Sequence, residues 1–222
     1  MATEKTREKI ITAFMALVAE EPWDAVTMPA IAKATGIKLD ALRAAYDSRL
    51  AILEDFSRRT DVVVLKGLDP NLHEEKIRDR FFEVLMQRFD ALAPYKAGLR
   101  ALARQARRDP LLGLALARSV FRSQGWMVMA TGLGADGLDG AARTQAVTMA
   151  YLETLRVWLD DDEPGMAKTM AALDRALRTA ERRLGRLARL GRLVMPGRFG
   201  SKRSADNDES EFPADDAAAG TA

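Results

Sequence analysis

Apolar residues recur at three- and four-residue intervals along most of the chain, the spacing that places them on one face of an α-helix. The first such run covers residues 6–20, and Pro22 ends it; its apolar side is formed by Ile10, Phe14 and Val18. No run of β-branched residues alternates with period two. The pattern therefore predicts an all-α protein.

Three short helices are predicted after the first one. Thr27 stands where an N-cap residue would begin the second helix, and Gly36 ends that helix after two turns. We expect Leu39 and Leu42 to face inward from the third helix. The pair Asp47-Ser48 then caps a fourth helix, so four helices fit within the first 65 residues.

A second, larger helical region is predicted after the break in periodicity at residues 67–70. Asn71 and Glu74 have the spacing of a capping box and favour a helix start there. The breakers that follow are Pro94, Asp109-Pro110, a glycine-rich stretch and DDDEP. Between them we expect helices over residues 72–92, 95–107, 110–131, 140–159 and 164–190.

The segment TMPAIAKATGIKLDALRAAYDSR, residues 27–49, has the layout of a helix-turn-helix: a short helix, a tight turn at Gly36 and a second short helix. Glycine suits that turn because a left-handed backbone conformation strains a residue that carries a Cβ atom. On this arrangement Lys38, Asp40 and Arg43 lie on the exposed side of the second helix, where the major groove of a duplex would meet them.

The first quarter of the chain resembles the TetR family of bacterial regulators, on TREKIITAFMALVAEEPWDAVTMPAIAKATGIKLDALRAAYDSRLAILEDF. The resemblance implies a helix-turn-helix DNA-binding domain over residues 1–48, a connecting helix over 49–66, and a helical ligand-binding and dimerisation domain over 71–190. Three residues depart from the family pattern: Lys38 replaces a small hydroxyl residue, Arg43 a tyrosine and Arg49 a lysine. The expected DNA-binding residues are Thr27, Lys38, Leu39, Asp40, Arg43, Tyr46 and Arg49.

The resemblance also implies an apolar small-molecule site in the C-terminal helices. Its expected residues are Phe82, Leu85, Met86, Phe121, Trp126, Met129, Met149 and Tyr151. Methionine and tryptophan at helical spacing are also what an ordinary core or a dimer seam contains, and that interpretation remains open. The function expected on this basis is a TetR-type transcriptional regulator, a repressor that binds double-stranded DNA as a homodimer and is released by an apolar ligand.

A second resemblance gives an alternative function. Residues 126–181 are similar to the lipid-binding proteins of coenzyme Q biosynthesis, in a Met/Trp-rich helix, a Gly/Asp loop and an acidic link before the last helix. That similarity implies a non-enzymatic lipid-binding accessory protein of ubiquinone biosynthesis at the membrane surface. The basic segment 182–199 would then be a membrane-seeking amphipathic helix. Its leucines recur every three residues, so the apolar stripe drifts by about 60° at each step.

Charge is distributed unevenly along the chain. Residues 1–66 carry ten basic and ten acidic residues, whereas residues 96–122 carry seven basic residues and one acidic residue. We expect the basic run at Arg100, Arg104, Arg107 and Arg108 to be a solvated helix face. Residues 204–222 hold six acidic residues and no basic one, which predicts a disordered acidic tail.

Several kinds of chemistry are excluded by composition. The chain has no cysteine and a single histidine, His73, which rules out thiol catalysis, Cys-ligated metals and a histidine pair. The acidic run at residues 160–163 precedes a helix start, where carboxylates cap the helix. We therefore expect no metal, no cofactor, no catalytic residues and no enzyme activity. No apolar run approaches the ~20 residues of a membrane span, and MATEKTREK lacks the apolar core of a signal peptide, so a cytoplasmic location is expected.

Overall fold

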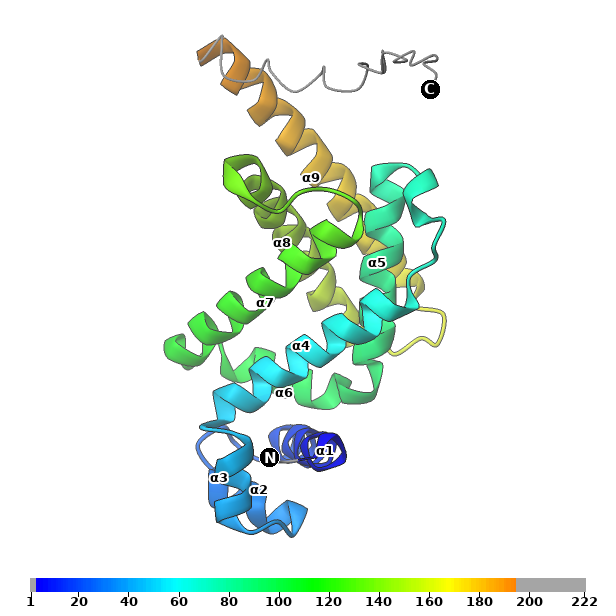
Figure 1. Cartoon of the computed structure of the whole chain (residues 1–222). Helices are drawn as coiled ribbons and strands as arrows, with labels where there is room; N and C mark the ends of the chain where they lie inside the picture. The colour runs from blue at the N-terminus through cyan, green and yellow to red at the C-terminus, as the bar shows by residue number, and fades with distance from the viewer. Residues whose placement is uncertain (1–2, 195–222) are drawn as a thin grey trace, which may run out of the picture. The chain divides into compact units, whose positions relative to one another are not determined.

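Every regular element in the described part of the chain is helical, which confirms the expected all-α class. The structure, a computed structural model, describes residues 3–194, with side-chain surroundings through residue 186. Figure 1 shows how the helices are arranged. In chain order the elements are α1 (Glu4–Glu20), α2 (Met28–Thr35), α3 (Leu39–Ala45), α4 (Arg49–Gly67), the 3-10 turn η1 (Leu72–Glu74), α5 (Ile77–Leu92), the 3-10 turn η2 (Ala93–Tyr95), α6 (Lys96–Gln105), α7 (Pro110–Ala130), α8 (Gly137–Asp160) and α9 (Ala167–Val194).

The chain divides into two units, and the first of them, Met1–Gly185, is compact and holds α1 to α8 and most of α9. The second unit, Arg186–Ala222, begins with the last turns of α9. The basic segment 182–199 is therefore described as helix only as far as Val194, and the expected acidic tail at 204–222 lies outside the described residues.

The first three helices form as the sequence predicts. Ile10, Phe14 and Val18 are buried on α1. The Thr27 hydroxyl accepts a hydrogen bond from the backbone N–H of Ala30 at 3.3 Å, which caps α2. Gly36 follows α2 with a φ of 65°, in the left-handed region that the tight turn requires.

The prediction that Leu39 faces inward is wrong. Leu42 is fully buried, but Leu39 is 51% exposed. Lys38 is the N-cap of α3, so Leu39 is its first residue and lies three positions before Leu42. The buried residues of α3 are Leu42 and Ala45, and each three-residue step turns by about 60° in the same sense, so Leu39 lies about 90° from the middle of the buried side. Leu39 therefore lies on the solvent side of the short helix.

The expected helix start at Asn71 is also wrong. Residues 72–74 form a separate 3-10 turn, and α5 begins only at Ile77. The Asn71 side chain makes no capping hydrogen bond. Instead, Arg80 donates to the backbone carbonyls of His73 and Glu75 and holds the turn apart from the helix.

The link between α8 and α9 is organised by Asp161 and by two cations of α6. The buried carboxylate of Asp161 accepts hydrogen bonds from the Thr169 backbone N–H at 2.9 Å and the Thr169 hydroxyl at 2.7 Å. These bonds hold the pKa of Asp161 below its ordinary value. Lys96 donates to the Asp161 carbonyl, and Arg100 donates to the Leu159 carbonyl at 2.8 Å. Arg100 is therefore not part of a solvated face, because it serves the carbonyl groups at the end of α8.

The N-terminal helices pack on the C-terminal helices mainly where α1 meets α6. A Cβ atom at Gly98 of α6 would lie 2.7 Å from the Met15 carbonyl oxygen, so only glycine permits this approach. Deeper in the C-terminal region, the centre of the Phe89 ring lies 5.4 Å from the ring centres of both Tyr151 and Trp158.

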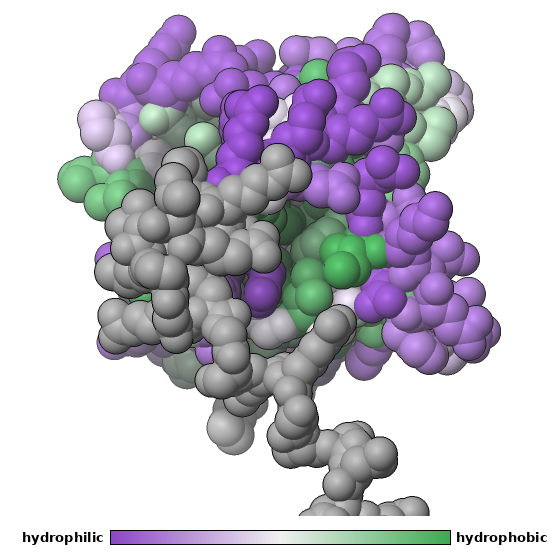
Figure 2. Space-filling model, turned by 90° about the horizontal axis from the view of Figure 1, so that it is seen from above, coloured by the Kyte–Doolittle hydropathy of each residue, from purple (hydrophilic) through white to green (hydrophobic). Residues whose placement is uncertain are grey.

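In the view from above, the described surface is mostly hydrophilic, and hydrophobic residues are visible in a hollow near its centre (Figure 2).

Candidate nucleic-acid interface and adjoining groove

The outer surface of α2 and α3 carries three exposed cations. Lys38 is the N-cap of α3, Arg43 is in its last turn, and Lys33 is in the last turn of α2. Thr27, at the start of α2, is exposed as well. Sequence reasoning missed Lys33, although its position two residues after Ile31, about 200° around the helix, already placed it away from the buried side of α2.

Two carboxylates share this surface with the cations. Arg43 pairs with Asp47 one turn later, and both side chains are largely exposed. Asp40 is exposed in the first turn of α3, where the helix dipole favours a negative charge. An exposed pair of this kind contributes at most about 1 kcal/mol, so a phosphate group can displace Asp47 from Arg43 at low cost.

Arg49, which was expected to bind DNA, makes its described contacts within the protein. Its guanidinium carbon is 4.1 Å from the centre of the Trp23 ring. It donates hydrogen bonds to the Trp23 carbonyl and, at 3.2 Å, to the Val26 carbonyl. Arg49 therefore ties the first turn of α4 to the loop between α1 and α2.

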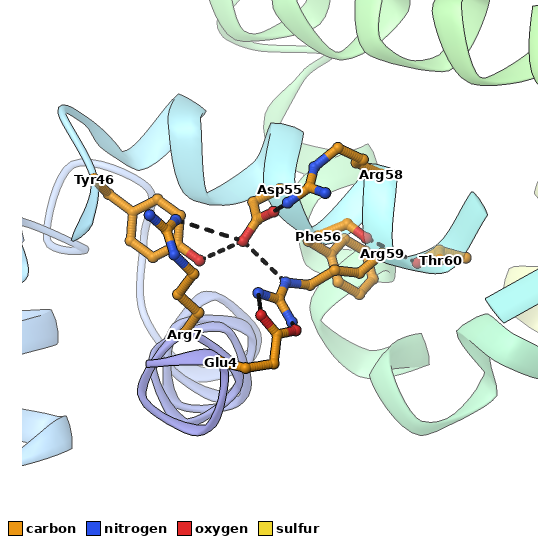
Figure 3. Close-up of polar contacts among 8 residues, drawn as sticks. All are labelled: Glu4, Arg7, Tyr46, Asp55, Phe56, Arg58, Arg59 and Thr60. Carbon is orange, nitrogen blue, oxygen red and sulfur yellow. Dashed lines mark hydrogen bonds and ion pairs between the residues drawn. The ribbon is translucent and has the colours of Figure 1, made fainter. Parts of the chain in front are cut away.

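Tyr46 is buried, and its hydroxyl group serves an internal cluster around Asp55 (Figure 3). The hydroxyl donates a hydrogen bond to Asp55 Oδ2 at 2.5 Å, and Arg59 Nε donates to the same oxygen at 2.9 Å. Arg58 donates to Oδ1, and the Arg7 guanidinium lies 4.9 Å from the centre of the Tyr46 ring. The cluster joins α1, the end of α3 and α4.

The protonation of this cluster follows from its hydrogen bonds. Burial alone would raise the pKa of Asp55, but the bonds from Tyr46, Arg59 and Arg58 outweigh it and hold the pKa below the ordinary value. Burial and the bond to Asp55 together raise the pKa of Tyr46 to about 12. Tyr46 thus remains a hydrogen-bond donor to an ionised carboxylate throughout the neutral range.

Tyr46→Phe is expected to lower the free energy of unfolding by about 1.5 kcal/mol at pH 7, because it removes a hydrogen bond to a charged group. Without that bond the folded-state pKa of Asp55 rises. The loss is therefore fully present above the unfolded pKa of about 4 and shrinks as the pH falls through the folded-state pKa. Urea unfolding at pH 7, 5, 3.5 and 2 measures it, because the folded-state pKa of Asp55 lies below its ordinary value. Tyr95→Phe is the control, since Tyr95 packs edge-on against Phe56; an equal loss at every pH in Tyr46→Phe would contradict the assignment.

The residues expected to bind an apolar ligand do not share one environment. Leu85 and Tyr151 are buried, whereas Phe82 and Met86 are partly buried. The other four, Phe121, Trp126, Met129 and Met149, are between 39% and 50% exposed. On α7 the inward positions are instead taken by Met127 and Val128.

A groove of about 630 Å³ lies beside the Asp55 cluster, between α4 and α7. Of the eight residues expected to bind a ligand, Trp126 lines it. Its other apolar lining includes Val62 and Leu65, and its charged lining includes Arg58 and Arg122. The end of α3 also borders it, through Ala45, Tyr46 and Asp47. The groove thus places an apolar wall and exposed cations next to the helix-turn-helix.

Comparisons with known proteins identify the fold. No family model matches the sequence, and no similar curated protein is found. A TetR transcriptional regulator from Nitrosomonas europaea superposes with a TM-score of 0.64 at 21% identity, over 80% of this chain and 99% of the other. A TetR transcriptional regulator from Rhodococcus sp. RHA1 gives a TM-score of 0.53 at 17% identity, over 80% and 96% of the two chains. This chain has the TetR regulator fold.

The expected TetR-like architecture is thereby confirmed, with the helix-turn-helix at the N-terminal end of the fold. Within the described residues, no helix is long and apolar enough to cross a membrane. In the same part of the chain, no three His, Cys, Asp or Glu side chains gather into a group that could hold a metal ion.

Proposed function

We propose that this protein is a transcriptional regulator of the TetR type, which binds duplex DNA as a homodimer and is released by an amphipathic small molecule. The observation that carries the proposal is the surface of α2 and α3, where Lys33, Lys38 and Arg43 are exposed on a helix-turn-helix. The two solved structures compared above are described as TetR transcriptional regulators. The role requires no catalytic group.

The geometry supports α3 as the helix that enters the major groove. Its exposed side carries Lys38, Leu39 and Arg43, which together offer donors for phosphate or guanine and an apolar contact for a thymine methyl group. In a dimer, two such helices meet half-sites about one helical turn, or ~34 Å, apart. Exposed methionines on α8 and α9, Met149 and Met170, support a dimer interface on those helices.

Repression and its release follow from the same arrangement. A dimer bound over a promoter excludes other proteins from it. A ligand that binds better to the form with the wrong half-site spacing lowers DNA affinity by its difference in binding energy between the two forms.

Lys38→Ala is expected to weaken binding to a labelled duplex from upstream of the gene. It should also lower the slope of log affinity against log salt by about 0.9 for each phosphate group that the protein no longer neutralises. Lys76→Ala is a matched control, because Lys76 is an exposed N-cap residue of α5 whose side chain, like that of Lys38, makes no capping hydrogen bond. Fluorescence anisotropy at 50 and 200 mM salt measures both variants. If Lys38→Ala binds as tightly as Lys76→Ala, α3 is not the contact helix.

A further inference from the structure

We propose that the groove between α4 and α7 binds an amphipathic carboxylate, with its apolar chain on Val62, Leu65 and Trp126 and its carboxylate on Arg122 and Arg58. This inference rests on the proposed function in one respect, since it names the class and place of the ligand that releases DNA. It differs from the expectation drawn from the sequence, because most of the residues expected there do not line this groove.

The size and lining of the groove fit a small molecule. Its volume of about 630 Å³ falls within the ~300–1,000 Å³ of ligand-binding pockets. Trp126 is 49% exposed and Val62 is 39% exposed, although both line a concave surface. An apolar chain laid over them would remove that hydrophobic area from water.

Two of the four carboxylates that line the groove, Asp55 and Asp61, are already matched by protein donors. Asp55 accepts hydrogen bonds from Tyr46, Arg58 and Arg59. Asp61 accepts from Arg88 and, at 2.6 Å, from the Ser123 hydroxyl. Neither buried carboxylate therefore offers an unpaired negative charge to a cationic ligand. The other two, Asp47 and Glu54, are exposed and pair with Arg43 and, at 3.7 Å, with Arg122.

The arginines at the rim are less fully used. Arg122 is 63% exposed, and its only described ion pair is to Glu54 at 3.7 Å, too long for a hydrogen bond. Arg58 is 67% exposed and uses Nη2 alone, toward Asp55. A guanidinium group has five N–H donors in a planar fork, which matches a carboxylate. The unpaired donors can hold an anionic head group, which would replace Glu54 as the partner of Arg122.

The place of the groove provides the link to DNA. The groove is also lined by Ala45, Tyr46 and Asp47, which are the last residue of α3 and the two residues that follow it. Asp47 is also the ion-pair partner of Arg43. A molecule seated here touches the end of the DNA-contacting helix directly.

The chain contains its own reporter for this binding. Trp126 lines the groove, whereas Trp23 and Trp158 are only 7% and 1% exposed. Titration with decanoate, below its micelle-forming concentration and without DNA, is expected to change tryptophan emission in a saturable way. Trp126→Phe should abolish the response. Decan-1-ol and decyltrimethylammonium, with the same chain length, should bind at least about tenfold more weakly.

Arg122→Gln is expected to weaken decanoate binding about tenfold, since it removes a charged donor pair. Arg118→Gln is the matched control, because Arg118 is exposed one turn earlier on α7 and does not line this groove. Equal binding of decanol and decanoate, an unchanged affinity in Arg122→Gln, or a response that persists in Trp126→Phe would each overturn the inference.

A separate arm tests the release of DNA. Decanoate added to the protein–DNA complex is expected to lower the anisotropy of the labelled duplex, and Arg122→Gln should need about ten times more decanoate. If decanoate binds the free protein but the complex persists, the binding site stands and release by this ligand is refuted. If the protein binds DNA but not decanoate, the regulator function stands and the carboxylate site is refuted.

Discussion

Asp61→Ala is expected to lower the free energy of unfolding by about 3–5 kcal/mol, because it breaks a buried ion pair by removing one partner. Asp61 on α4 pairs with Arg88 on α5, and their side chains are only 10% and 4% exposed. Removing the carboxylate leaves the Arg88 charge buried without its partner, and the Ser123 hydroxyl loses its acceptor as well. Chemical denaturation at neutral pH measures the loss.

A second variant tests whether the lost stability comes from an unpaired buried charge or from lost packing. Asp61→Leu combined with Arg88→Met removes both charges, and we expect it to restore most of the stability. Glu54→Ala is the control on the same helix, since Glu54 is 59% exposed and its pair with Arg122 is long; it should change stability by less than about 0.5 kcal/mol. A double variant as unstable as Asp61→Ala would show that charge burial is not the cause.

Gln124→Leu is expected to raise the free energy of unfolding by about 1–3 kcal/mol, the penalty for a buried polar group without a partner. Gln124 on α7 is fully buried, and neither its amide nitrogen nor its amide oxygen has a hydrogen-bond partner among the described residues. Leucine has a similar size and no polar atoms, so it removes the desolvation cost while filling the space.

Ser123→Ala, at the neighbouring position, is expected to change the free energy of unfolding in the opposite direction. The Ser123 hydroxyl donates to Asp61 at 2.6 Å, so its removal should lower stability by about 1 kcal/mol. Both variants are measured by chemical denaturation of the ligand-free protein. A loss of stability in Gln124→Leu would mean that the amide is hydrogen-bonded after all.

The fold could be predicted from local signals in the sequence. Thr27 and Gly36 fixed the ends of α2, because a capping hydroxyl and a left-handed glycine act over a few residues. Prolines and the acidic link separated the later helices in the same way. The start of α5 was misplaced because Arg80, near the beginning of α5, bonds the carbonyls of His73 and Glu75, a contact that the capping pattern does not reveal.

The candidate site was less predictable because it depends on tertiary contacts. Lys38 and Arg43 are exposed as expected, since their positions follow from the period of one short helix. The roles of Tyr46 and Arg49 could not be inferred, because their partners Asp55 and Trp23 lie on other elements. The groove was missed for the same reason: α4 ends at Gly67 and α7 begins only at Pro110, and no local pattern pairs them.

The salt dependence of duplex binding tests most directly whether α3 contacts DNA. Anisotropy is measured from 50 to 300 mM salt for the wild-type protein, for Lys38→Ala combined with Arg43→Ala, and for Lys76→Ala. We predict a steep linear fall of log affinity with log salt for the wild type and for Lys76→Ala, and a slope shallower by about 1.8 for the double variant. A wild-type protein that does not bind, or three equal slopes, would contradict this prediction.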